Sequence, residues 1–292
     1  MNGAESLVKT LLASKADVCF ANPGTSEMHF VAALDRHPEL RCILCLVEGG
    51  ASGAADGYYR MSGKVAATLL HLAPGFGNAF ANLHNARKAQ SGIVNVMGDH
   101  ASYHLRYESP LKGDTVGISQ AISQWTRVSG DATSVAVDGA AAVTAARALN
   151  GQIATLILPA NTAWEDAVAS AVAAAPPALR RPSQAQVLAA AEALRTPGAV
   201  LLLDGPVLYT ELAQVAARIA KASGAKLMAP FFAARSQRGA GTVRMQRMVY
   251  ELDQNVAILA ETTTLVLCGA AHGVLRLSRQ TQSARGPWNQ GD

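Results

Sequence analysis

Residues that could do chemistry gather in three Gly-rich segments, and each segment directly follows a short apolar run. The segments are ANPGTSE at 21–27, VEGGASG at 47–53 and HLAPGFGN at 71–78. The second contains the carboxyl group of Glu48, and the third begins with the imidazole of His71. Carboxyl and imidazole groups are the usual proton carriers of enzymes, so these segments could support general acid–base chemistry.

The first two segments each have a structural interpretation as well. Segment 21–27 could be a simple turn in which Thr25 or Ser26 caps a helix that opens at Glu27. Glu48 could be an exposed residue at a helix start, where a carboxylate complements the helix dipole. If instead Glu48 ends the apolar strand 41–47, it needs a buried hydrogen-bond partner.

The third segment is equally open. His71 ends an apolar run and could be a satisfied structural histidine. Pro74, Gly75 and Gly77 predict a loop, after which Asn78 begins a helix of about three turns. A G-x-G before a helix suggests phosphate binding, but the complete G-x-G-x-x-G spacing is absent.

The elements that must position these segments are short strands that alternate with helices. This alternation predicts an α/β fold made of two parallel-sheet, three-layer α/β/α domains, with ligands at the carboxyl ends of the strands. The predicted strands are 18–21, 41–47, 65–71, 93–97, 154–158, 199–203, 226–229 and 264–268. The predicted helices are 4–13, 27–34, 50–61, 137–149, 210–222 and one that follows Ser183 as its N-cap.

Composition excludes several function classes. The 292 residues are 50% hydrophobic and 16% charged, which is globular, and no run of about eighteen apolar residues predicts a membrane span. The net charge of +4 is not clustered, so no nucleic-acid partner is expected. The start of the chain lacks a signal-peptide pattern, and we expect a cytoplasmic protein. The Cys42-x-x-Cys45 pair lies in a predicted buried strand, which favours packing over a metal site.

The order and spacing of the motifs are more specific than any one of them. FANPGTSE, LVEGGASGAADGYYRMSGK, HLAPGFGNAFANLHNARKA and VNVMGDHA together resemble the N-terminal, pyrimidine-binding domain of thiamine-diphosphate enzymes of the acetolactate synthase and benzoylformate decarboxylase group. The resemblance implies a pyrimidine-binding domain at 1–170, a linker at 171–182 and a partial central domain at 183–273. Residues 274–292 do not follow the family pattern and are expected to form a disordered tail.

The resemblance also implies roles for individual residues. The Glu at the position of Glu48 hydrogen-bonds N1′ of the aminopyrimidine, so that the 4′-imino group removes the thiazolium C2 proton. His71 would transfer a proton, and Thr25 would hydrogen-bond the substrate carboxylate; Asp99 and His100 are second-rank candidates. The other implied cofactor-binding residues are Asn22, Pro23, Gly24, Gly75 and Asn78.

One half of the family's cofactor site has no counterpart in the sequence. The family holds Mg²⁺ and the diphosphate in a C-terminal domain marked by GDG, and no GDG occurs here. The chain is therefore expected to supply only the pyrimidine half, to be inactive alone, and to come from a truncated or frameshifted gene, with a natural split subunit as the alternative. We expect a homo-oligomer with a small 2-oxo acid substrate, and a separate diphosphate-domain subunit as a further partner. Carboligation by an acetolactate synthase-like enzyme, decarboxylation by a benzoylformate-type enzyme, a non-catalytic subunit, and FAD binding all stay open.

Overall fold

The computed structural model describes residues 1–269 except 177, 179–180 and 210. The chain divides into two compact units, Met1–Pro182 and Ser183–Asp292. The predicted tail at 274–292 lies outside the described residues. None of the helices in this part of the chain is both long and apolar enough to cross a membrane.

The first unit is built on a six-stranded, all-parallel sheet in the order β2-β1-β3-β4-β6-β5. Its strands are β1 (Val18–Asn22), β2 (Arg41–Leu44), β3 (Ala66–Leu70), β4 (Ile93–Asp99), β5 (Trp125–Val128) and β6 (Ile153–Pro159). Its helices are α1 (Gly3–Ala13), α2 (Met28–Arg36), α3 (Glu48–Ser62), α4 (Leu72–Lys88), α5 (Thr115–Gln120), α6 (Val135–Ala146) and α7 (Ala160–Trp164), with a 3₁₀ turn η1 (Thr25–Glu27).

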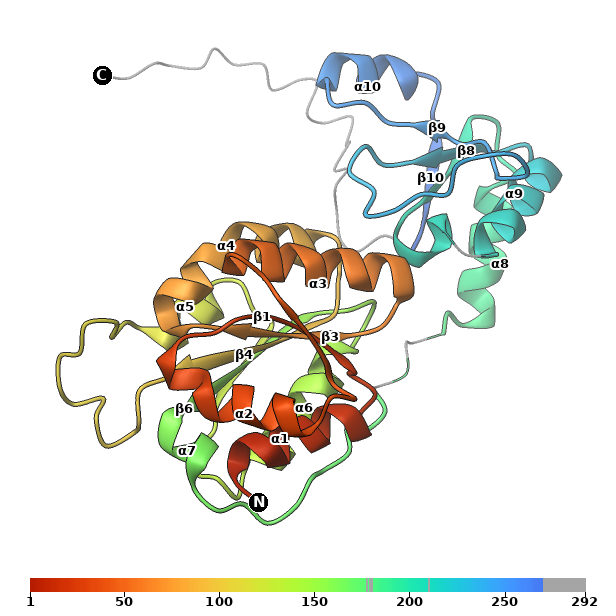
Figure 1. Ribbon diagram of the computed structural model, residues 1–292. Coiled ribbons are helices and arrows are strands. Elements are labelled where there is room, and N and C mark those ends of the chain that lie inside the picture. The colour runs from red at the N-terminus through yellow and green to blue at the C-terminus, as the bar shows by residue number, and fades with distance from the viewer. Residues whose placement is uncertain (177, 179–180, 210, 270–292) are drawn as a thin grey trace, which may run out of the picture. The chain divides into compact units, whose positions relative to one another are not determined.

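The helices cover both faces of this sheet (Figure 1). On one face, α1, α2 and α6 pack over side chains such as Leu69, and on the other, α3 and α4 pack over side chains such as Leu70. The central strands β3, β4 and β6 are buried along their whole length, as continuous apolar runs in a parallel sheet predict. The predicted three-layer α/β/α architecture is confirmed for this unit.

The strand connections reverse direction between β1 and β3. The chain leaves β1 for β2 on one side and returns to place β3 on the other, so the direction of the connections reverses there. In open α/β sheets, ligands bind at the carboxyl ends of the strands at such a reversal. The candidate residues of segments 21–27 and 71–78 follow β1 and β3 directly.

The second unit is a smaller parallel sheet in the order β10-β7-β8-β9. Ser183 caps the first helix as predicted, and its hydroxyl accepts a hydrogen bond from Gln186 N. The elements are α8 (Gln184–Ala193), β7 (Ala199–Leu203), a 3₁₀ turn η2 (Gly205–Leu208), α9 (Leu212–Ser223), β8 (Lys226–Ala229), β9 (Gln246–Arg247), α10 (Leu252–Ile258) and β10 (Thr264–Cys268).

Two predicted elements around the candidate site are wrong. Strand β2 ends at Leu44 and lies at the sheet edge, so the run 41–47 is not a buried strand and Cys42 is exposed. The predicted Pro74–Gly77 loop is helical, because α4 begins at Leu72. Pro74 falls in the first turn of α4, where a missing backbone N–H loses no helical hydrogen bond.

Candidate functional site

Glu48 is the first residue of α3, and only 6% of its surface is exposed. The sequence offered a buried strand-end Glu or an exposed helix-start Glu, and the structure shows a buried Glu at a helix start. Asn78 Nδ2 donates a hydrogen bond to Glu48 Oε2 at 3.0 Å. This hydrogen bond holds Oε2 in place beside the N-terminal end of α3.

The second carboxylate oxygen of Glu48 faces Gly75 on α4. A Cβ added at Gly75 would lie 2.6 Å from Oε1, so the carboxylate can occupy this position only beside a glycine. Within the described part of the chain, Oε1 accepts no hydrogen bond. The site therefore presents a buried carboxylate with one oxygen held and the other available to a ligand.

Close packing of α3 against α4 holds this arrangement. Asn82 Nδ2 donates to Gly49 O at 2.6 Å, and Ser52 Oγ donates to Ala79 O at 3.2 Å. Gly49 and Gly53 leave room for α4, since an added Cβ at either would lie 3.2 Å from an atom of that helix. The small residues after Glu48 thus set the distance between the two helices.

His71 occupies the N-cap position of α4. Its side chain pairs with Glu27, which was not predicted as a site residue. Its Nδ1 lies 2.8 Å from Glu27 Oε2, and the two side chains are 20% and 2% exposed. When the Glu27 carboxylate is ionised it accepts the Nδ1 hydrogen, which leaves Nε2 as the atom able to exchange a proton with a ligand.

Gly24, in the segment after β1, lies against His71, the residue after β3. Its backbone N–H donates to Glu27 Oε2 at 2.7 Å, and a Cβ added at Gly24 would overlap the His71 ring. The expected Thr25 or Ser26 cap is absent: the first turn is a 3₁₀ turn with Gly24 in the N-cap position. Thr25 is exposed at the start of this turn.

Glu27 is almost fully buried, and burial raises the pKa of its carboxyl above 4.5 against the hydrogen bonds from Gly24 and His71. Its other oxygen, Oε1, is sealed from solvent without a hydrogen-bond partner and lies against Gly98. A signal was present in the sequence: Glu27 stands three residues after Gly24, the spacing at which a Glu side chain returns to an N-cap N–H.

The raised pKa of Glu27 predicts a pH-dependent stability. A carboxyl group with a raised folded-state pKa contributes stability that is complete below its unfolded value of 4.5 and is lost as pH rises through the folded value. We therefore compare the free energy of unfolding of wild type with that of Glu27→Gln. The difference in favour of wild type should decrease as pH rises from 4.5. Urea unfolding between pH 4 and 7 measures it, with Glu39→Gln as the exposed control. Parallel pH curves for wild type and Glu27→Gln would contradict the assignment.

Asn22 and Asp99 form hydrogen bonds with residues other than Glu48 and His71, and the buried Nε2 of His100 has no hydrogen-bond partner among the described residues. Asn22 Nδ2 donates to Cys45 O at 2.8 Å, which ties β1 to the segment before α3. Asp99 accepts hydrogen bonds from His100 N at 2.8 Å and Thr115 Oγ1 at 2.7 Å, as a strand-end Asp that caps a turn does. Among the described residues, neither Asp99 nor His100 forms a hydrogen bond with Glu48 or His71.

The structure therefore joins the candidates in two groups. Glu48, Gly75 and Asn78 form one, and Gly24, Glu27 and His71 form the other. Gly75 bridges the groups, because its added Cβ would lie 3.3 Å from both Glu48 Cδ and His71 Cβ. In the described part of the chain, no group of three or more His, Cys, Asp and Glu side chains is suited to holding a metal ion.

The chain is similar in sequence to known thiamine pyrophosphate enzymes. Residues 1–126 match the family described as thiamine pyrophosphate enzyme, N-terminal TPP binding domain. The Mycobacterium tuberculosis protein IlvX, named as an acetolactate synthase large subunit, is 46% identical over 92% of this chain and 52% of its own length. Benzoylformate decarboxylase of Pseudomonas aeruginosa is 32% identical over 48% of this chain and 24% of its own length.

A solved structure shows the same fold. The thiamine diphosphate-dependent 4-hydroxybenzoylformate decarboxylase of Rhodococcus jostii superposes with a TM-score of 0.68 at 22% identity, over 79% of this chain and 44% of that one. The chain spans about half the length of IlvX and less of the Pseudomonas enzyme. Residues 1–126 therefore match the N-terminal domain of the thiamine pyrophosphate enzyme family.

Proposed function

We propose that this chain supplies the pyrimidine side of a thiamine-diphosphate site in an enzyme that acts on 2-oxo acids. The observation that carries the proposal is Glu48: a buried carboxylate at a helix start, with Oε2 held by Asn78 and Oε1 without a protein partner. Glu48 Oε1 could form a hydrogen bond with a ring nitrogen of a ligand. The family match covers this residue.

The chemistry of the neighbouring residues supports binding of the cofactor's pyrimidine. Gly75 carries no side chain that would meet Glu48 Oε1, and Glu48 and His71 both lie at the carboxyl edge of the sheet, after β2 and β3. When bound, the cofactor supplies a carbon nucleophile and an electron sink for 2-oxo acid chemistry. We place its diphosphate and Mg²⁺ on residues outside 1–269, and we propose that the assembly is an oligomer.

Within this site each side chain would have a distinct task. Glu48 would hold a proton at Oε1 and share it with the ring nitrogen of the pyrimidine. His71 would give or take a proton at Nε2, with Glu27 orienting the ring through Nδ1. Thr25, exposed at the start of η1, would hydrogen-bond the substrate carboxylate.

We propose carboligation of the acetolactate synthase type as the reaction, because the relative matched over most of this chain is named for it. The pairing of His71 with Glu27 favours a second candidate, decarboxylation of the benzoylformate type, in which a proton donor at the reacting carbon is needed. Product analysis with pyruvate and with benzoylformate separates them. Acetolactate from pyruvate supports the first, and benzaldehyde from benzoylformate supports the second.

The direct test uses the pyrimidine half of thiamine, 4-amino-5-hydroxymethyl-2-methylpyrimidine, as the probe. We expect NMR to detect its binding to the full chain at millimolar concentration, and the binding to disappear in Glu48→Gln, because the amide cannot share a proton with the ring in the same way. Glu39→Gln is the control, since Glu39 is exposed before β2. Equal binding to wild type and Glu48→Gln would overturn the proposal.

A further inference from the structure

A cavity lies at the amino ends of the central strands, away from Glu48 and His71. It has a volume of about 540 Å³ and is lined by residues that precede strands or follow helices. Asp17 directly precedes β1 and Lys64 and Val65 directly precede β3, so the cavity opens at the amino ends of these strands. Its volume lies within the range of small-molecule sites, which is about 300 to 1,000 Å³.

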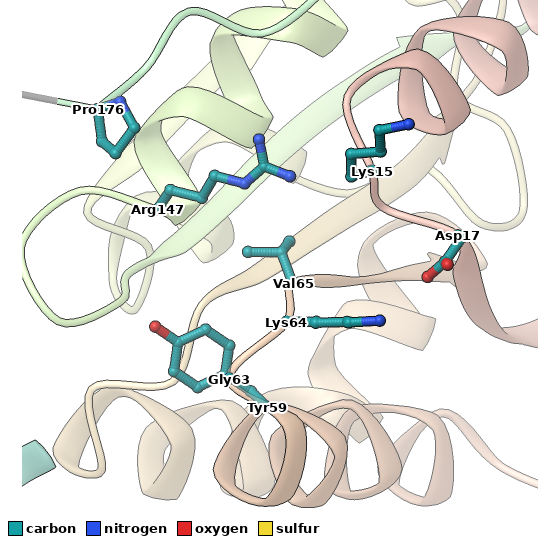
Figure 2. Close-up of a pocket in the computed structure, with 8 residues that line it drawn as sticks. All are labelled: Lys15, Asp17, Tyr59, Gly63, Lys64, Val65, Arg147 and Pro176. Atoms are coloured by element: carbon teal, nitrogen blue, oxygen red, sulfur yellow. The ribbon is translucent and has the colours of Figure 1, made fainter. Parts of the chain in front are cut away.

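The charge of the lining is strongly positive. Lys15, Lys64 and Arg147 line the cavity together with one carboxylate, that of Asp17. Over the described residues, the side chains of Lys15, Lys64 and Asp17 form no salt bridge or hydrogen bond. In Figure 2 the Arg147 guanidinium lies above Val65, and the Lys15 and Lys64 side chains extend toward the side where Asp17 lies. Two unpaired ammonium groups and a guanidinium around one cavity attract an anion.

Arg147 is held in place with donors to spare. One guanidinium nitrogen, Nη2, donates to the backbone carbonyl of Ser14. A guanidinium carries five N–H donors, so the others remain for a second acceptor. Partial burial lowers the pKa of Arg147, and no carboxylate in the described chain compensates its charge. A bound anion would supply that compensation.

Lys15 departs from the usual residue type at its position. It follows the end of α1 with a φ of 60°, in the left-handed region. Helices α3 and α9 end in the same conformation with Gly63 and Gly224, whereas Gln90 and Leu149 adopt it after α4 and α6. Glycine adopts this conformation without strain, whereas a lysine there costs about 1 kcal/mol. The backbone alone would favour glycine, and the lysine instead places an ammonium group at the cavity.

The remaining wall is not a charged surface. Tyr59 contributes its ring, because its hydroxyl already donates to Asn150 O at 2.5 Å. Val65 is buried at the base. The cavity thus combines cationic groups with an apolar wall, which suits a small organic molecule that carries a compact, doubly charged anion.

We propose that this cavity binds the phosphate group of a small phosphorylated molecule. Arg147 would contact two phosphate oxygens through its planar donors, and Lys15 and Lys64 would act as point charges on the others. The helices α1, α3 and α6 end here, and their negative dipole ends reduce the net attraction. We therefore expect millimolar affinity for inorganic phosphate and a requirement for all three cations. This proposal is independent of the proposed thiamine-diphosphate chemistry.

The test measures the thermal midpoint, Tm, of the full chain in sodium phosphate and in sodium chloride of equal ionic strength. At phosphate concentrations about ten times the Kd, we expect Tm to rise by about 3 °C more than in chloride. The extra rise should disappear in Lys15→Gly and in Lys64→Gln, and Asp17→Asn should enlarge it. Phosphate also stabilises proteins generally by exclusion from their surfaces, and this effect is the same in every variant.

Lys15→Gly separates binding from folding. Glycine suits the conformation at position 15, so this variant should be at least as stable as wild type in chloride while losing the phosphate response. The matched control is Lys226→Gln, which removes the same charge from an exposed strand residue of the second unit. Equal phosphate responses in wild type and Lys15→Gly would overturn the proposal, as would a response to citrate without a response to phosphate.

Discussion

We expect Glu48→Gln to lower the rate of the proposed 2-oxo acid decarboxylation by about 10²- to 10⁴-fold, the range that a positioned acid–base group contributes. Glu48 is buried, and its Oε2 already accepts the Asn78 amide hydrogen. A Gln side chain fills the same space and keeps a hydrogen-bonding oxygen toward Asn78. It cannot carry the exchangeable carboxyl proton, so the chemistry is lost while the packing is retained.

The measurement requires the diphosphate-binding part of the family's site, supplied as a separate polypeptide from a full-length relative, with thiamine diphosphate and Mg²⁺. Carbon dioxide release from pyruvate and from benzoylformate is followed for wild type, Glu48→Gln and Glu48→Asp. Glu48→Asp should keep part of the rate, because it retains the carboxyl group at a shorter reach. Glu39→Gln is the control for a lost surface carboxylate. A Glu48→Gln rate above half of wild type would show that another group carries the proton.

Gly98→Ala is expected to lower the free energy of unfolding of the first unit by about 3 kcal/mol. A Cβ at Gly98 would lie 2.6 Å from Glu27 Cδ and 2.9 Å from Cγ, far inside ordinary contact. Gly98 belongs to the central strand β4, which cannot move aside, so the Glu27 side chain must leave its position. Overpacking costs about 1 to 3 kcal/mol, and loss of the buried hydrogen bonds to Gly24 and His71 adds to it.

Urea unfolding checks this prediction. Gly57→Ala is a matched control, because Gly57 lies within α3 and an added Cβ there meets no atom within 4 Å. That substitution should raise stability by about 0.5 to 1 kcal/mol through helix propensity. In a Glu27→Ala background, Gly98→Ala should cost much less, since the overlapping carboxyl is gone. Strict additivity of the two substitutions would mean that they do not share one contact.

The strands near the site show where prediction from sequence succeeds. The runs at 18–21, 65–71, 93–97 and 154–158 each contain most of one observed strand, because central strands of a parallel sheet are apolar on both faces. The run at 41–47 looked equally apolar and became a short edge strand with Leu46 fully exposed. Composition does not distinguish a central from an edge strand, since strand order arises from the whole chain. Strand β5 at Trp125–Val128 was not predicted, because its sequence mixes polar and apolar residues.

The start of α4 shows a different limit. Pro74, Gly75 and Gly77 are turn formers by local propensity, yet all three are helical. Pro74 is tolerated in the first turn, and Gly75 is required by the close approach of Glu48 Oε1. Tertiary contact therefore decided the conformation where local preference pointed to a loop.

The sequence by itself determined the alternation of strands and helices, the family of the first domain and the choice of Glu48 and His71 as residues to examine. Those features reside in the period, order and spacing of residues along the chain. The tertiary structure alone decided that Glu48 starts a helix, that Glu27 pairs with His71, and that Lys15, Lys64 and Arg147 line one cavity. These contacts join residues on different strands and helices, and they exist only once strand order and helix packing bring the side chains within a few ångströms.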